Sequence, residues 1–258
     1  MIKKFIILTS IINATFCMEH EIIEPIIPID EPLHIAILVS GNGSNMEAIL
    51  SCFERFEKRG LIKPCVVISN KKDAYALKRA QKEVETKFKN PVPTEYLPIK
   101  AAVTEEEKEN ARREYAHKLI ACLSKYDVTP ENGLICAAGF MLILHKDFIN
   151  HFPNKIINIH PSLLPAFPGA DAIKKAFLSG VKITGVTVHF IDEGMDTGLI
   201  IKQKSVDIDN YDTEKTLEEK IHKVEHELFP KVIEQYATDK IAIAHDKVRN
   251  RLVVYIID

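Results

Sequence analysis

Asn158 and His160 stand two positions apart in the chain, and this pair of side chains could perform acyl-transfer chemistry. Residues i and i+2 of an extended strand point to the same face, so the amide and the imidazole would face one spot. A neutral hydrogen-bond donor beside a titratable ring can hold the oxygen of a tetrahedral acyl intermediate and move its protons. Asp196, in the acid-rich segment 192–198, could add a carboxylate that orients the imidazole and favours its protonated form.

A histidine by itself does not mark a site, because the 258 residues include ten histidines and a lone histidine is most often structural. The hypothesis for His160 depends on its surroundings. Asn158 precedes it, the rigid prolines Pro161 and Pro165 follow it, and the loop around Asp196 brings acidic side chains. This combination favours a functional site over a structural histidine.

A second candidate site is the glycine-rich segment 40–45, which lies between an apolar run and a helical pattern. Backbone N–H groups of such a turn, at the N-terminus of a helix, form a binding site for an anion. The segment has neither the Gly-Lys-Ser/Thr of a Walker loop nor the G-x-G-x-x-G of a dinucleotide site. Taken alone, a tight turn from strand to helix is an equally good interpretation.

These groups must be positioned by strands and helices that alternate along the chain. Apolar runs predict strands at 34–39, 65–68, 97–99, 134–138, 155–160, 185–190 and 199–204. Helical spacing predicts helices at 44–59, 73–84, 105–125, 172–179 and 213–233, and a terminal hairpin is predicted from 241–245 and 252–257. Such alternation predicts an α/β fold: a Rossmann-like, mostly parallel twisted sheet with helices on both faces.

The composition excludes several classes of protein. A hydrophobic content of 46% with 27% charged residues is typical of a globular chain with one large domain. The net charge of -2 gives no surplus of Lys and Arg, so we expect no nucleic-acid partner. The five cysteines lack C-x-x-C spacing, which argues against a disulfide framework or a zinc site and favours a reducing compartment. Cys65 and Cys136 lie in apolar runs and are expected to be buried.

The N-terminus conflicts with a reducing compartment. Lys3 and Lys4 precede the apolar run 5–12, as in a secretory signal, although the run is too short to span a bilayer and the segment 14–17 is a poor cleavage site. Three interpretations remain open: a signal, an unstructured extension, or a start placed upstream of Met18. The last two are favoured, and a Pro-rich connector at 25–32 would then lead into the first strand.

Taken together, these blocks resemble the signature of the formyltransferases that use 10-formyltetrahydrofolate. The resemblance covers residues 35–230, and its blocks follow the family's order: 40–45, 68–74, 138–141, 158–165, 167–169, 192–198 and 225–226. Within the family, the chain is most similar to the enzymes that formylate glycinamide ribonucleotide in purine biosynthesis. The resemblance therefore implies the formyltransferase fold and transfer of the formyl group of 10-formyltetrahydrofolate, the co-substrate, to the amino group of this nucleotide by direct attack through a tetrahedral intermediate.

The resemblance also implies a role for each catalytic candidate. His160 would be the general acid and base, and Asn158 would donate a hydrogen bond to the oxyanion. Asp196 would favour the protonated imidazole and position a proton-carrying water. Because the attack is direct, Ser162 is not expected to act as a nucleophile, and no metal is expected, since Asn158 and His160 already meet the oxyanion.

The same resemblance implies binding residues for both substrates. For the phosphate and ribose of the nucleotide they are Gly41, Asn42, Gly43, Ser44, Asn45 and, at the ribose hydroxyls, Glu225. For the folate they are Arg112, Met141, Leu142, Ile143, Leu144, Asp192, Glu193, Gly194 and Met195, and His189 is expected to face the same cleft. Leu142 and Ala166 stand where the family usually has basic residues, so we expect altered contacts at both positions.

We expect the chain to be organised around one catalytic unit. Residues 1–32 would form an N-terminal extension, signal-like or disordered, and residues 33–258 a single formyltransferase domain. Within it, 33–139 would bind the nucleotide, 140–235 the folate, and 236–258 would form the hairpin. The expected partners are the two small-molecule substrates alone, without nucleic acid or membrane, and the expected state is a cytoplasmic monomer or homodimer.

Three alternatives fit the same signature less well. A methionyl-tRNA formyltransferase should carry a further basic domain, whereas only 28 residues, 231–258, follow Pro230. A formyltetrahydrofolate deformylase should begin with a regulatory domain, for which residues 1–32 leave no room. A non-catalytic homologue that only binds is disfavoured because Asn158, His160 and Asp196 are all present.

Overall fold

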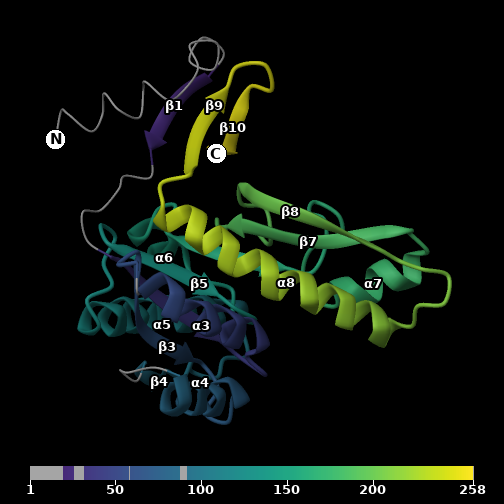
Figure 1. Ribbon diagram of the computed structural model, residues 1–258. Coiled ribbons are helices and arrows are strands. Elements are labelled where there is room, and N and C mark those ends of the chain that lie inside the picture. The colour runs from purple at the N-terminus through teal and green to yellow at the C-terminus, as the bar shows by residue number, and fades with distance from the viewer. Residues whose placement is uncertain (1–19, 26–31, 58, 88–91, 258) are drawn as a thin grey trace.

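The computed structural model of the chain describes residues 20–25, 32–57, 59–87 and 92–257 (Figure 1). Its main body is a seven-stranded sheet with the strand order β4-β3-β2-β5-β6-β7-β8. The strands are β2 (Leu33–Val39), β3 (Ile62–Ser69), β4 (Thr94–Tyr96), β5 (Gly133–Ala137), β6 (Ile156–His160), β7 (Ile183–Phe190) and β8 (Ile200–Asp207). The helices are α3 (Ser44–Glu57), α4 (Tyr75–Lys87), α5 (Glu105–Lys125), α6 (Lys146–His151), α7 (Ala172–Ser179) and α8 (Glu214–Ala237).

The direction of the strands changes once across this sheet. Each neighbouring pair from β4 to β6 is parallel, whereas β7 is antiparallel to both β6 and β8. The predicted mostly parallel α/β sheet is therefore confirmed. All seven residues of β2 are buried, as expected for a central strand covered on both faces.

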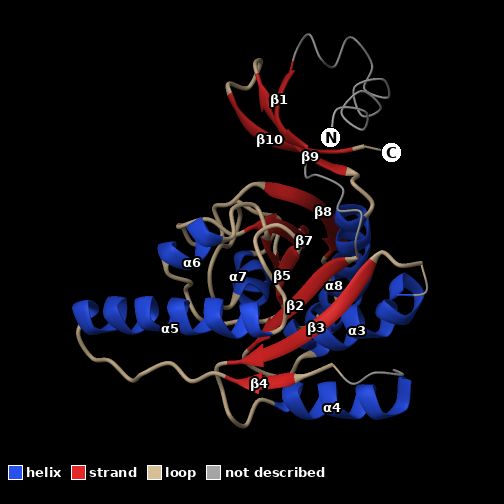
Figure 2. Cartoon of the chain, turned by 90° about the vertical axis from the view of Figure 1, so that its left-hand side faces the viewer, coloured by secondary structure: helices blue, strands red, loops and turns tan. Residues whose placement is uncertain are grey.

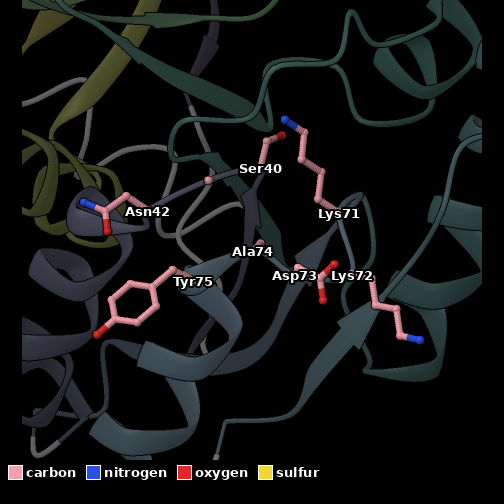
Figure 3. A pocket seen from close by; sticks show the side chains of 8 residues that line it. Ser40, Asn42, Lys71, Lys72, Asp73, Ala74 and Tyr75 are labelled. Atoms are coloured by element: carbon pink, nitrogen blue, oxygen red, sulfur yellow. The ribbon is translucent and has the colours of Figure 1, made fainter.

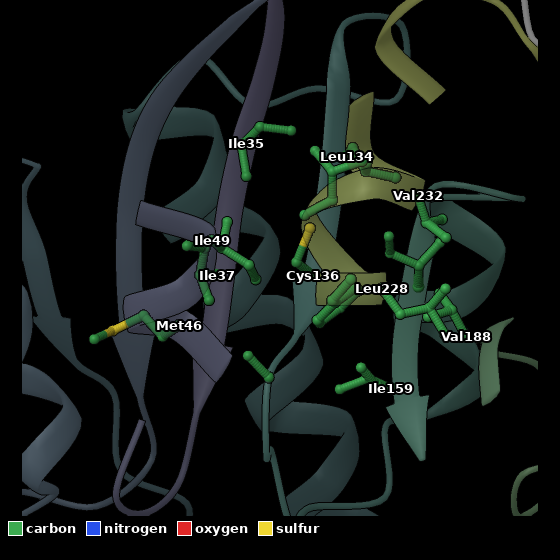
Figure 4. Close-up of a cluster of buried hydrophobic side chains, with 14 of the residues drawn as sticks. Ile35, Ile37, Met46, Ile49, Leu134, Cys136, Ile159, Val188, Leu228 and Val232 are labelled. Carbon is green, nitrogen blue, oxygen red and sulfur yellow. The ribbon is translucent and has the colours of Figure 1, made fainter. Parts of the chain in front are cut away.

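Two apolar clusters cover the two faces of the sheet. The larger cluster joins α3, α4 and α8 to one face, with Phe53, Leu228 and Val232 among its fully or nearly fully buried members (Figure 4). The smaller cluster packs α5 and α6 on the other face, through side chains such as Leu119 and Phe148. Figure 2 shows the sheet between these helical layers. The buried Cys65 and Cys136 belong to these clusters, as predicted.

A second, three-stranded antiparallel sheet with the order β1-β9-β10 stands beside the main body (Figure 1). The predicted terminal hairpin is present as β9 (Ile241–Asp246) and β10 (Arg251–Ile256), paired from Ile241 with Ile256 to Asp246 with Arg251. The sequence did not predict β1 (His20–Pro25), which pairs with β9. The signal-like segment 3–17 lies outside the described residues.

Two other sequence-based predictions need correction. The third strand was expected at 97–99, but β4 ends at Tyr96, and the Leu97 N–H closes the pairing with the Ser69 carbonyl at 2.8 Å. Pro98 has no N–H to extend the ladder. The short helix α6 was not predicted, because its N-cap is His145, whose Nδ1 accepts the Asp147 N–H at 3.1 Å, and histidine is not among the usual N-cap residues.

Candidate active site

Strand β6 turns Asn158 and His160 to one face of the sheet. The intervening Ile159, together with Ile157, is buried in the cluster under α3 and α8, so the two polar side chains point to the opposite face. His160 is the last residue of the strand, at the carboxyl end of the parallel part of the sheet. Asn158 and His160 therefore share one face of the sheet, as their spacing of two residues predicts.

Asp196 reaches this place from the loop between β7 and β8. Its backbone is in the left-handed region, with φ 55°, a conformation that aspartate tolerates better than most residues. Its Oδ2 accepts the Gly169 N–H at 2.7 Å and lies 3.4 Å from Nδ1 of His160. Two loops that are distant in sequence thus hold the carboxylate against the imidazole.

A second imidazole, that of His189, lies between Asn158 and Asp196. His189 is the residue of β7 that pairs directly with Asn158 of β6, so both side chains share one face. Its Nε2 is 3.2 Å from Nδ2 of Asn158 and 3.6 Å from Oδ1 of Asp196. The structure thus brings Asn158, His160 and Asp196 together, with His189 as a fourth member.

The ring of His160 has an oxygen acceptor at each nitrogen. Nε2 lies 2.9 Å from the carbonyl oxygen of Phe167, and Nδ1 faces the Asp196 carboxylate. The ring can donate to both oxygens at once only when both of its nitrogens carry protons. Since the residue is only 5% exposed, these contacts replace water around the ring. These two acceptors therefore fix the orientation of the His160 ring.

The surroundings of Asp196 strongly favour the ionised form of its carboxyl group. The neighbouring imidazole of His189, the Gly169 N–H and His160 outweigh the opposing effect of burial, and together they lower the pKa of Asp196 to about 2. The carboxylate is consequently ionised at neutral pH, as a partner for a cationic imidazole must be.

The glycine-rich turn lies at the carboxyl end of β2 and leads directly into α3. Ser40, Gly41 and Asn42 line one side of a pocket of about 650 Å³, and residues 71–75 line the other (Figure 3). Gly43 has φ 78°, and a Cβ there would lie 2.5 Å from the Ala76 Cβ, so only glycine fits this close approach. The turn thus leads from the pocket lining at Gly41 and Asn42 into the N-terminus of a fourteen-residue helix, the kind of place where backbone N–H groups bind an anion.

One hydroxyl ties this turn to the segment expected to bind folate. Ser40 Oγ accepts the Met141 N–H at 2.8 Å and donates to Oδ1 of Asn70 at 2.7 Å. Ser40 is 2% exposed, so this contact is shielded from water. The chain segments that follow β2, β3 and β5 therefore meet at a single side chain.

Glu225 lies on the buried side of α8, facing the start of α3. Its Oε2 accepts from Nδ2 of Asn45 at 3.0 Å and from Nδ1 of His222 at 2.8 Å. The hydrogen bond that His222 donates to Glu225 is the main cause that raises the pKa of His222, whereas burial lowers the pKa of His226, whose ring stacks on that of His222 at 6.2 Å. Glu225 and Asn45 are thus together, as the ribose assignment requires.

The apolar segment after Phe140 divides into two kinds of side chain. Met141 and Ile143 are 72% and 55% exposed, whereas Leu144 is buried in the cluster under α5 and Leu142 packs against it. Met141 and Ile143 are therefore free to line a pocket with their side chains. Leu142 and Leu144 instead pack toward the apolar cluster under α5.

Arg112 lies on α5 and joins this segment through Glu109. Its Nη1 is 3.2 Å from Glu109 Oε2, while Glu109 Oε1 is 3.1 Å from Nε2 of His145, the residue after Leu144. The loop with the other folate candidates is folded around Asp192, which accepts from the Gly194 N–H and the Thr197 hydroxyl. Glu193, Gly194 and Met195 are exposed in this loop.

No role was predicted for His222, although it lies three residues before Glu225 on the same helical face. The i, i+3 spacing with a carboxylate is the signal that could have identified it. Among the described residues, no group of three or more His, Cys, Asp or Glu side chains is arranged to hold a metal ion. In the same part of the chain, no helix is both long and apolar enough to cross a membrane.

Comparison with known proteins finds similar enzymes. Phosphoribosylglycinamide formyltransferase of Bacillus subtilis is 39% identical over 200 residues, which cover 78% of this chain and 92% of that protein. The trifunctional purine biosynthetic protein adenosine-3 of Gallus gallus is 34% identical over 209 residues, but this chain spans only 19% of its length.

Solved structures give the same result. Glycinamide ribonucleotide transformylase 1 of Symbiobacterium toebii aligns with a TM-score of 0.74 and 34% identity, over 89% of this chain and 96% of that one. Phosphoribosylglycinamide formyltransferase of Anaplasma phagocytophilum aligns with a TM-score of 0.72 and 33% identity, over 88% and 96%. The model of the formyl transferase family matches residues 33–233, which include every site residue described above, and the chain belongs to this family.

Proposed function

We propose that the chain transfers the formyl group of 10-formyltetrahydrofolate to the amino group of glycinamide ribonucleotide, as a phosphoribosylglycinamide formyltransferase of purine biosynthesis. The observation that carries this proposal is the convergence at the end of β6, where His160 Nδ1 lies 3.4 Å from the Asp196 carboxylate and Asn158 shares the same face. An amide donor, a titratable ring and an ionised carboxylate are the groups that formyl transfer to an amine needs.

The proposed roles follow from the chemistry of these groups. The amine attacks the formyl carbon directly, and the oxygen becomes an oxyanion that accepts a hydrogen bond from Asn158. His160, oriented by Asp196, acts as the general acid and base that moves a proton from the attacking amine to the leaving folate nitrogen. Asp196 also positions the water through which the proton passes.

The proposed substrate sites lie on either side of this centre. The backbone of Gly41, Asn42 and Gly43, with Ser44 and Asn45, would hold the phosphate and ribose, and Glu225 would accept hydrogen bonds from the ribose hydroxyls. On the other side, Met141 and Ile143 would contact the folate heterocycle. Arg112, Leu142, Leu144 and the loop 192–195 would complete that pocket.

The wider context is also part of the proposal. The enzyme would act in the cytoplasm on these two small molecules, as a monomer or homodimer without a nucleic-acid partner. Residues 33–139 would serve the nucleotide and 140–235 the folate, with 236–258 as an appended hairpin and 1–32 as an extension. Burial of Cys65 and Cys136 and a net charge of -2 support this assignment.

The direct test is to follow tetrahydrofolate formation from 10-formyltetrahydrofolate with glycinamide ribonucleotide as the acceptor. We expect turnover that depends on the acceptor. Product without any acceptor would instead identify a deformylase, and formylation of methionyl-tRNA in place of the nucleotide would identify a tRNA formyltransferase. Binding of both substrates without turnover would leave only a non-catalytic homologue.

A further inference from the structure

His189 is a buried histidine between two of the proposed catalytic groups, and the reaction outlined above gives it no task. Its side chain is about 2% exposed, and it faces Asn158 across the β6–β7 pair. The titratable group that faces its Nε2 is Asp196, with His160 on the other side of that carboxylate. The hydrogen-bond partners of its two ring nitrogens indicate its role.

The hydrogen-bond partners fix which nitrogen carries the proton. Nδ1 lies 2.7 Å from the Phe190 carbonyl oxygen, which can only accept, so Nδ1 must donate. In the neutral ring Nε2 is then an acceptor. Nδ2 of Asn158, which can only donate, lies 3.2 Å away, so the two groups match.

This contact determines how the Asn158 amide is turned. A side-chain amide can rotate by half a turn and exchange its oxygen for its nitrogen, and only a neighbour with a fixed preference selects one orientation. The lone pair of Nε2 selects the nitrogen. One N–H of Asn158 is then used by His189, and the second N–H remains for an oxyanion in the cleft.

The same nitrogen cannot serve Asn158 and Asp196 together. If His189 gained a second proton, Nε2 would donate to Asp196 Oδ1, now 3.6 Å away, and would repel the amide N–H of Asn158. Asn158 would then have to present its oxygen, which cannot bind an oxyanion. The shorter 3.2 Å contact identifies Asn158 as the partner of Nε2.

We propose that neutral His189 is a positioning residue, which holds the Asn158 amide with its nitrogen toward the reacting formyl oxygen. This inference rests on the proposed function, because it assumes that Asn158 binds the oxyanion. His189 itself touches neither substrate in this scheme and acts through Asn158.

The test is a double-mutant cycle on the full chain, with His189→Met and Asn158→Ala alone and combined. Glutamine and methionine have similar length and neither carries the Nδ1–H, so His189→Gln is the matched variant that restores an acceptor near the position of Nε2. The kcat and both KM values are measured with 10-formyltetrahydrofolate and glycinamide ribonucleotide, and thermal unfolding confirms that each variant is folded.

We expect Asn158→Ala to lower kcat about 100-fold and His189→Met about 10- to 100-fold, as for the loss of one oxyanion donor, with both KM values within about threefold of the wild type. Because His189 acts through Asn158, the double variant should equal Asn158→Ala within about twofold. His189→Gln should recover most of the kcat that His189→Met loses.

Several outcomes would overturn the proposal. The losses of the two single variants could multiply in the double variant, His189→Gln could be as slow as His189→Met, or His189→Met could leave kcat unchanged. If His189→Met does not fold, a kcat of His189→Gln more than about 30-fold below the wild type would have the same meaning. A wild-type rate in Asn158→Ala would instead reject the proposed role of Asn158, so the two failures are distinguishable.

Discussion

Two polar clusters in this molecule are built from the same kinds of residue. At the end of β6, one carboxylate, Asp196, meets two histidines and an asparagine. On α8, one carboxylate, Glu225, meets the asparagine at the start of α3 and His222, whose ring stacks on that of His226. We assign both clusters to substrate sites, yet we expect only the first to carry out chemistry.

The difference lies in where the asparagine donates. Asn158 donates to the imidazole of His189, and in this cluster it is the carboxylate of Asp196 whose pKa is lowered, to about 2. Asn45 donates to the carboxylate itself, and the pKa shifts appear on the histidines, upward for His222 and downward for His226. The first arrangement offers donors to a developing negative charge, and the second offers an acceptor to hydroxyl groups.

The largest expected effect separates the two clusters by kcat. His160→Ala should lower kcat about 1,000-fold, because the general acid and base is lost, whereas His222→Ala should leave kcat within about threefold. His117→Ala, an exposed histidine on α5, is the control. Equal losses of kcat in His160→Ala and His222→Ala would remove the distinction between the clusters.

The next prediction compares the two carboxylates. Glu225→Gln should raise KM for glycinamide ribonucleotide about 10-fold with little change in kcat, since a charged hydrogen bond to the bound nucleotide is weakened. Asp196→Asn should instead lower kcat with little change in KM. Glu227→Gln, on the same helix but paired with Lys204 at 2.8 Å, should behave as the wild type. A kcat effect in Glu225→Gln would argue against a pure binding role.

The pKa of Asp196 predicts a stability difference in acid. A carboxyl whose folded pKa is lowered stabilises the fold above its unfolded pKa, near 3.8, and this contribution disappears as the pH falls toward about 2. It amounts to about 2 kcal/mol, and the side chain is only 14% exposed. Urea unfolding should show that the wild type has a larger free energy of unfolding than Asp196→Asn at pH 6, and that this difference is lost at pH 2. A difference in the free energy of unfolding that does not change with pH would contradict the prediction.

The smallest expected effect concerns the stacked pair on α8. The raised pKa of His222 stabilises the fold below the ordinary histidine range, and this contribution is lost as the pH rises through the raised value. His222→Gln should therefore lower the unfolding temperature by about 1–2 °C at pH 6 and by less at pH 9. His226→Gln should show the opposite trend, because burial lowers the pKa of His226 and its protonation at low pH costs stability. If the unfolding temperatures of both variants changed with pH in the same direction, the pKa values of His222 and His226 would not be shifted in opposite directions.

The parts of this architecture that depend on local pattern were predictable from the sequence. The alternation of Asn158 with buried isoleucines, and the glycine turn before α3, both follow from strand and helix periodicity. The meeting of Asn158 with His189 does not, because it depends on the register between β6 and β7, and a shift of one residue would send His189 to the other face. The strand β1 was missed for the same reason, since it is defined by its pairing with β9.

The hydroxyl of Ser40 has a consequence for how the two substrates meet. By bonding to Met141 and Asn70 at once, it fastens the cradle proposed for the nucleotide to the wall proposed for the folate. The distance between the attacking amine and the formyl donor is then set by the protein before either ligand binds. Ser40→Ala, which removes this oxygen, would therefore loosen both ligand sites together.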